Sequence, residues 1–312
     1  MQIYRVIKLL LRRMKVAVLA IDGLEHDLVS RWDLNFFKQK YYGKIDVKVA
    51  VKPGDPLYTP LIWGSFLLGK PVYFFGLDMG KIKQERMKLF YGKLYPLFKL
   101  KKKFLGGKNL HLRRFLMRIG LADFNAIVKS LSKIEALPSS ALQHTFVAEA
   151  ERRGYKVFCK EFPTLRESRY AEMRAMFSKF FNLPLKDKLL KLEEVFQYSS
   201  ELLDEMVTAL ESHDLLLYYT SVIDYAQHML YRPRNLKYMA VLRSTYKKLA
   251  SLLSSLVPKS GNLCTLIVSD HGYDPVKQEH SDHGFWSLNI KPPKIPKTIL
   301  DFKDIILELL TL

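Results

Sequence analysis

Four short, continuously apolar segments occur along this 312-residue chain, and three of them carry an aspartate at the end of the apolar run. Apolar runs of this length are typical of strands that are buried on both faces of a parallel sheet. They cover residues 15–23, 155–162, 214–224 and 263–272. Helical spacing of apolar residues predicts helices between them, over residues 139–154, 188–213 and 235–257. The alternation predicts an α/β fold, with a mostly parallel central sheet and helices on both faces.

The positive charge of the chain is unevenly distributed. The formal net charge is +19, and the segment Lys81–Arg118 holds 13 lysines and arginines with a single acid, Glu85. This basic and aromatic stretch, about residues 81–136, interrupts the alternation. It predicts a helical insertion, either a solvated element or a cap over an anionic substrate. We interpret residues 1–14 as an N-terminal extension and residues 15–312 as one domain that carries the insertion.

The cysteine content and the hydropathy indicate the compartment. Hydrophobic residues make up 48% of the chain, which is enough for a large core. The two cysteines, Cys159 and Cys264, are too few for a disulfide framework and fit a reducing compartment. No apolar run reaches the ~18 residues of a membrane span, and no signal-type cleavage site follows the apolar start. The sequence therefore predicts a cytoplasmic protein without a transmembrane segment.

Acidic residues and histidines occur at the ends of the predicted strands. Asp22, Asp224 and Asp270 come at carboxyl ends, which form the ligand-binding edge of an open α/β sheet. His271 follows Asp270 directly, and His228 follows Asp224 by four residues, the spacing of one helix face. Carboxylate and imidazole together are ligands for zinc, manganese or iron rather than for calcium. One acid after a strand is often only a helix N-cap, but the joint pattern predicts a metal site.

The segment YTPLIWGSFLLGK, residues 58–70, has a hydroxyl side chain at the expected start of a helix. Two interpretations of Thr59 are open, and they are compatible. In the first, Thr59 caps the helix and Pro60 occupies the first helical position, where proline is tolerated. In the second, Thr59 attacks phosphorus, because a helix N-terminus favours an anionic group and a nearby metal ion lowers the pKa of the hydroxyl.

These motifs, in chain order, resemble the alkaline phosphatase superfamily and, within it, the type I phosphodiesterase/nucleotide pyrophosphatase branch. The matching segments read AIDGLEHD, YTPLIWGSFLLG, TSVIDYAQH, IVSDHGYD and HSDHGFW. The resemblance covers about residues 15–288, with 81–136 outside it. It implies an alkaline-phosphatase-like hydrolase domain over residues 15–312, with the basic segment as an insertion or cap.

The resemblance also implies a set of site residues. Thr59 is the expected nucleophile, beside two divalent metal ions that are more readily zinc than manganese. One ion is expected to be held by Asp22, Thr59, Asp270 and His271. The other is expected to be held by Asp224, His228 and a late histidine. Spacing before Gly284 favours His280 as this last ligand, and His283, in the second Ser-Asp-His-Gly, is its rival.

The implied reaction is hydrolysis of phosphodiester or pyrophosphate bonds in a small phosphate ester, with nucleotides among the candidate substrates. No lysine or arginine lies beside the metal motifs in sequence, which favours a diester over a monoester. One alternative is a phosphomonoesterase or phosphonate hydrolase of the same superfamily. An alternative of another class is a protein that binds nucleic acid or another polyanion through Lys81–Arg118.

Overall fold

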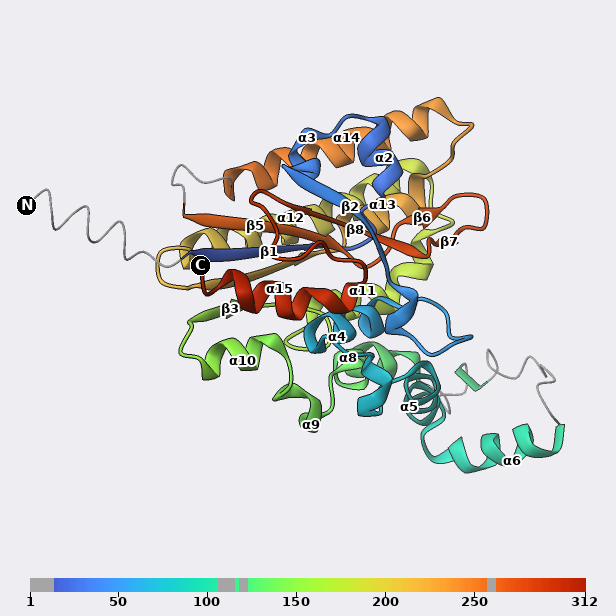
Figure 1. The fold of residues 1–312 in the computed structure, drawn as a ribbon. Helices are drawn as coiled ribbons and strands as arrows, with labels where there is room; N and C mark the ends of the chain where they lie inside the picture. The colour runs from blue at the N-terminus through green and yellow to red at the C-terminus, as the bar shows by residue number, and fades with distance from the viewer. Residues whose placement is uncertain (1–13, 106–115, 118–122, 257–261) are drawn as a thin grey trace, which may run out of the picture.

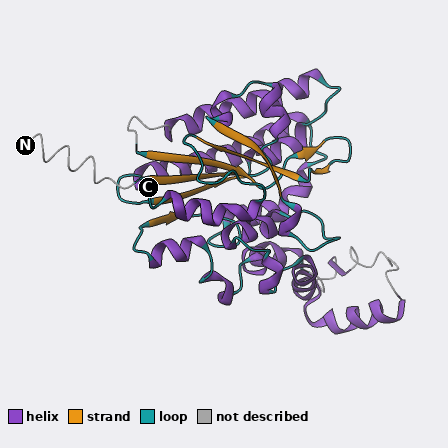
Figure 2. Ribbon diagram, viewed as in Figure 1, coloured by secondary structure: helices purple, strands orange, loops and turns teal. Residues whose placement is uncertain are grey.

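The computed structural model describes residues 14–105, 116–117, 123–256 and 262–312. The predicted N-terminal extension lies outside these residues except for Met14, as do residues 106–115 and 118–122 of the basic insertion. The described chain is built around one six-stranded sheet with the order β2-β8-β5-β1-β4-β3 (Figures 1 and 2). Its strands are β1 (Lys15–Ile21), β2 (Tyr41–Asp46), β3 (Val157–Cys159), β4 (Leu215–Thr220), β5 (Leu263–Ser269) and β8 (His283–Leu288).

The centre of the sheet is parallel, as the sequence predicts. Strand β1 pairs in parallel with both β4 and β5, and β3 pairs in parallel with β4. Strands β1, β4 and β5 are buried almost throughout, which explains why they occur as continuous apolar runs. Strands β8 and β2 add an antiparallel edge. The register aligns Ile21 with Thr220, so the carboxyl ends of β1 and β4 meet at one edge.

Helices cover both faces of the sheet, which confirms the predicted fold class. Above the sheet in Figure 1 lie α2 (His26–Arg31), α3 (Asn35–Lys38), α13 (Val222–Leu230) and α14 (Leu236–Leu253). The long α12 (Leu185–Ala209) packs against β4 and α13. Below the sheet lie α4 (Thr59–Leu68), α10 (Phe146–Arg152) and α15 (Phe302–Leu309). Short 3₁₀ segments cover Lys48–Ala50, Val72–Phe75, Gly92–Leu94, Phe177–Phe180, Ser254–Leu256 and Ile299–Asp301.

Three elements differ from their predictions by more than a few residues at one end or in kind. The predicted helix 139–154 is broken into α9 (Ser139–Leu142) and α10, because the Thr145 hydroxyl accepts a hydrogen bond from the amide of Ala148 and starts a new helix. The predicted strand 155–162 is ordered as a strand only over β3. The predicted strand 214–224 ends at Thr220, and Asp224 lies in the first turn of α13 rather than at the end of a strand.

The basic insertion is helical where the structure describes it. It contains α5 (Met79–Tyr91), α6 (Tyr95–Leu105) and α8 (Phe124–Glu135), and α8 packs against α5 and α11 (Arg169–Met176). A small core of its own lies there, separate from the main core and formed by Phe90, Ile127, Leu131 and Ala171. Part of Lys81–Arg118 falls outside the described residues, so the polyanion role stays a prediction. No helix within the described residues is long and apolar enough to cross a membrane.

Helix α4 is bounded so that its first residue faces the sheet edge. Gly69 ends it with a φ of 62°, in the left-handed region that glycine adopts without strain. A Cβ at this position would come within 2.8 Å of the Cβ of Lys303, so the packing of α15 also requires a glycine. All ten residues of the helix, from Thr59 to Leu68, are buried. Thr59 is therefore held on a rigid element.

Candidate metal centre

The first group of candidate ligands follows strands β1 and β5. Asp22 and Asp270 come directly after these neighbouring strands, and His271 follows Asp270. Nε2 of His271 lies 3.1 Å from Oδ1 of Asp22 and 3.4 Å from Oδ2 of Asp270. All three side chains are buried. His271 is turned by its Nδ1 atom, which lies 3.0 Å from the carbonyl oxygen of Gly272, so Nε2 is the atom that faces the carboxylates.

The second group lies beside the first and combines α13 with a small hairpin. The hairpin pairs β6 (Tyr273–Asp274) with β7 (Glu279–His280). Oδ1 of Asp224 is 3.3 Å from Nε2 of His228 and 3.7 Å from Nε2 of His280. The two Nε2 atoms are 3.2 Å apart. One carboxylate and two imidazoles therefore converge on one point.

The two groups adjoin each other. The rings of His271 and His280 are stacked, with their centroids 3.6 Å apart. Gly23 brings the end of β1 against α13: the amide of Asp224 donates to the carbonyl oxygen of Asp22 at 3.0 Å. A Cβ on Gly23 would lie 2.8 Å from the Cα of Asp224, and its φ of 73° also favours glycine. The glycine that follows Asp22 in the sequence is thus what allows the two groups to meet.

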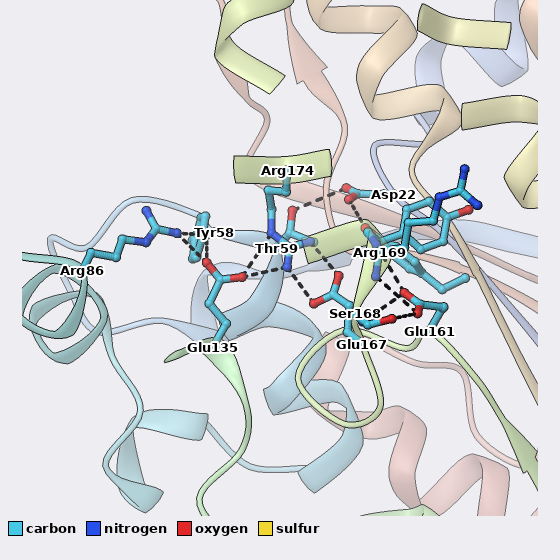
Figure 3. A network of polar contacts seen from close by, with 12 residues as sticks. Asp22, Tyr58, Thr59, Arg86, Glu135, Glu161, Glu167, Ser168, Arg169 and Arg174 are labelled. Atoms are coloured by element: carbon cyan, nitrogen blue, oxygen red, sulfur yellow. Dashed lines mark hydrogen bonds and ion pairs between the residues drawn. The ribbon is translucent and has the colours of Figure 1, made fainter. Parts of the chain in front are cut away.

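Thr59 faces the first group from the start of α4. Its hydroxyl lies 3.5 Å from Oδ1 of Asp22 and 3.4 Å from Nε2 of His271 (Figure 3 shows Thr59 beside Asp22). The capping interpretation does not describe its position. Tyr58 is the residue at the N-cap, and the helix has no side-chain cap hydrogen bond. The hydroxyl is therefore directed at the candidate ligands instead of at the helix backbone.

Burial and close contact shift the pKa values of the candidate ligands Asp270, His271 and His280. Burial, reinforced by the neighbouring Asp22, raises the pKa of Asp270 well above its ordinary value. Burial opposes charge on His271, yet Asp270 and Asp22 raise the pKa of that imidazole to about 10. Burial and the proximity of His271 lower the pKa of His280 to about 3. His280 is thus a neutral imidazole at pH 7, the form that binds a metal ion.

Two carboxylate oxygens test whether these residues fit a cation. Oδ1 of Asp224 and Oδ2 of Asp270 are buried, and neither accepts a hydrogen bond. Buried polar atoms normally have a partner, and a buried charge is normally paired or bound to a metal. The donor set is nitrogen and oxygen, which suits zinc or manganese. The residues present therefore fit divalent metal ions.

His283, the rival for the last ligand, points elsewhere. Its Nε2 atom lies 3.1 Å from Oε1 of Glu25. The other oxygen of Glu25 accepts a hydrogen bond from the amide of Tyr273 at 2.8 Å. The contact between His283 and Glu25 ties β8 to the loop after β1. Glu25, Asp27 and His283 also form a cluster of potential ligands, but Asp27 is already paired with Lys44 and His26.

Tyr219 was missed by sequence reasoning. Its hydroxyl donates to Oδ2 of Asp22 at 2.6 Å. It lies in β4 among other apolar and aromatic residues, where nothing in the sequence marks one tyrosine from the next. The register of β1 against β4 was the missing information, since it sets Tyr219 opposite Ala20, two residues before Asp22.

Comparison with solved structures finds neighbours of low sequence identity and low TM-score. The PH0037 protein from Pyrococcus horikoshii is 11% identical, with 96% of this chain and 97% of that chain covered and a TM-score of 0.46. Murine ectonucleotide pyrophosphatase/phosphodiesterase 5 is 14% identical, with 83% and 57% covered and a TM-score of 0.38. Alkaline phosphatase from the Antarctic bacterium TAB5 is 12% identical, with 96% and 99% covered and a TM-score of 0.43. No curated protein matches the chain in sequence.

A family match comes from the sequence of the second half. Residues 137–290 match the family model of type I phosphodiesterase / nucleotide pyrophosphatase. This segment includes Asp224, His228, Asp270, His271 and His280, whereas Asp22 and Thr59 precede it. Over residues 137–290 the chain thus matches the type I phosphodiesterase / nucleotide pyrophosphatase family, as its motifs predict, and this match supports a phosphodiesterase-like hydrolase.

Proposed function

We propose that the chain hydrolyses phosphodiester or pyrophosphate bonds, with Thr59 as nucleophile and two divalent ions beside it. The observation that carries the proposal is the position of the Thr59 hydroxyl, 3.5 Å from Asp22 and 3.4 Å from His271 at the N-terminus of α4. The family implies a phosphoester substrate and divalent metal ions. The identity of the nucleophile and the number of ions are our inference.

The ligand sets follow the two groups of side chains. Asp22, Thr59, Asp270 and His271 are proposed to hold one ion, and Asp224, His228 and His280 the other. The buried oxygens without hydrogen bonds, on Asp224 and Asp270, support both sets. Zinc is the preferred metal and manganese the second, since both accept imidazole with carboxylate. Bound divalent ions would neutralise the phosphoryl oxygens and favour the alkoxide of Thr59.

The chemistry assigned to this chain is a double displacement. The oxygen of Thr59 attacks phosphorus, the bond from phosphorus to one ester oxygen breaks, and the alcohol leaves with a proton. Water then attacks the phosphothreonine, which releases the phosphate product and restores the hydroxyl. The N-terminus of α4 favours the anionic phosphoryl group during both steps.

The surroundings of Thr59 favour a diester over a monoester. The fold brings two arginines, Arg86 and Arg174, to the neighbouring Tyr58. Both arginines form ion pairs with buried carboxylates. Glu135 pairs with Arg86 and with Arg174, and Glu167 also pairs with Arg174. These arginines are therefore already neutralised and do not offer a free charge to the additional anionic oxygen of a monoester.

The direct test compares two substrates. The protein is stripped with a chelator, resupplied with zinc or manganese, and assayed with bis-p-nitrophenyl phosphate and p-nitrophenyl phosphate. We expect no turnover without metal and faster turnover of the diester with it. Preference for the monoester would move the assignment to a phosphatase with the same ligands. Turnover that persists in the stripped protein would overturn the metal-dependent mechanism.

A further inference from the structure

A buried ionic network links the basic insertion to the residue before the proposed nucleophile. The Tyr58 hydroxyl donates to Glu135 of α8, and Arg86 of α5 donates to both Tyr58 and Glu135. Glu135 also pairs with Arg174 of α11 at 2.7 Å (Figure 3). Arg174 in turn pairs with both oxygens of Glu167, at 2.8 and 2.7 Å. The network contains two cations and two anions.

The network makes this part of the insertion a fixed wall. Glu135 is wholly buried, and the side chains of Arg174 and Glu167 are 15% and 2% exposed. Removing one member of a buried pair leaves an uncompensated charge, so the partners hold each other in place. Arg86 also lies over the ring of Tyr58, 5.4 Å from its centre. The ring is therefore clamped between the insertion and α4.

A pocket of about 410 Å³ opens against this wall. Its apolar side comes mainly from one face of α8, where Phe124, Ile127 and Leu131 succeed each other by three and four residues. Met87 and Ala175 complete the apolar lining, and the polar lining consists of Tyr58, Lys83, Arg86 and Arg174. No carboxylate lines the pocket. Its volume is within the range of small-molecule sites.

One cationic group of the lining remains open to a ligand. Glu135 already pairs with Arg86 and Arg174, so the open group is the amine of Lys83, which lies on the same helix as Arg86. Lys83 lies one turn earlier on α5, is exposed, and forms no ion pair within the described residues. The pocket thus combines an apolar body with unmatched positive charge, one residue along the chain from Thr59. A ligand complementary to it has a hydrocarbon body and a negative charge of its own.

We propose that this pocket binds the second ester group of the substrate, and that this group is an anionic amphiphile, aryl or alkyl. The inference rests on the proposed function, because it assumes a phosphodiester at Thr59. The hydrocarbon part lies between α5 and α8, and the anionic part pairs with Lys83. The basic insertion is then a specificity element of the hydrolase.

The test uses three diesters that release the same p-nitrophenol. Their second ester groups are methyl, 4-carboxybenzyl and 7-carboxyheptyl, so the last two separate aryl from alkyl bodies. We expect KM to be at least about 10-fold lower for one or both carboxylated esters than for the methyl ester, because a hydrogen bond to a charged group strengthens binding by about this factor. The variants Lys83→Glu and Ala175→Phe should remove this advantage. Lys81→Glu, an equal charge change outside the pocket, should behave as wild type.

The outcomes separate the pocket from the reaction. Equal KM for all three esters in the wild type, or an advantage that survives both variants, overturns the pocket proposal. If no ester is turned over, calorimetry with 4-carboxybenzyl phosphate still decides. Binding that Ala175→Phe weakens at least about 10-fold supports the pocket while the hydrolase proposal fails. Binding that both variants leave unchanged overturns the pocket as well.

Discussion

The hydroxyl of Tyr219 donates a hydrogen bond to Oδ2 of Asp22, with 2.6 Å between the two oxygens. The other oxygen of the same carboxylate faces Thr59 and His271. Burial of the phenol raises the pKa of Tyr219 well above its ordinary value, so it remains a donor at every pH of interest. Tyr219 therefore fixes the orientation of a proposed metal ligand without facing the ion itself.

Replacing Tyr219 by phenylalanine should weaken metal binding or activity by about 10- to 100-fold, the usual cost of losing a hydrogen bond to a ligand. Titration of the stripped protein with zinc measures this. Tyr218→Phe is the matched control, because its hydroxyl donates to the carbonyl oxygen of Ser199 at 3.0 Å and does not contact the candidate ligands. Equal zinc affinity in the two variants would contradict the role given to Tyr219.

The two late histidines should behave differently on substitution. His280→Ala removes a neutral imidazole that lies 3.2 Å from His228, so zinc affinity at one site should fall at least about 100-fold. His283→Ala breaks the contact with Glu25 instead and should leave the metal content unchanged. Metal analysis after gel filtration at limiting zinc distinguishes them. Loss of one ion from His283→Ala, with His280→Ala unaffected, would reverse the assignment.

Glu135→Gln should destabilise the protein by about 3–5 kcal/mol, the cost of breaking a buried ion pair from one side. It withdraws the charge that neutralises both Arg86 and Arg174. Urea unfolding measures the change in the free energy of unfolding. Glu193→Gln is the control, since Glu193 is 65% exposed in its pair with Lys248, and its loss should cost less than about 1 kcal/mol. Equal costs would show that the network does not fix the insertion.

Both cysteines should be inert in the native protein. Burial raises the pKa of Cys159 and of Cys264 to about 12. At pH 8, about one thiol in 10⁴ is then ionised, and the thiolate is the reactive form. A disulfide reagent such as DTNB should react with neither thiol until denaturant is added. Rapid reaction of one thiol before unfolding is the opposite result.

The sheet and its functional edge could be predicted because their signals are local. A buried parallel strand is a continuous apolar run, and an acid or a histidine at its end is visible in the same window. Asp22, Asp270 and His271 come together for that reason. Asp224 reaches them although the predicted strand end was wrong, because Gly23 brings the end of β1 against the first turn of α13.

Long-range contacts could not be predicted. Spacing alone left His280 and His283 as rivals, and what separates them in space is the β6–β7 hairpin, which pairs Tyr273 with His280. Arg174 pairs with Glu135, which is 39 positions earlier in the chain, and no local pattern in the sequence marks these two residues as partners. The antiparallel strands β2 and β8 were not predicted, because their pairing is visible only once the sheet is assembled.

The most direct test of the account is the rate of bis-p-nitrophenyl phosphate hydrolysis by Thr59→Ala, measured at a metal content equal to that of the wild type. We predict a rate at least about 10³-fold lower, because alanine removes the oxygen that attacks phosphorus. Full activity in Thr59→Ala with its metals bound would contradict Thr59 as the nucleophile.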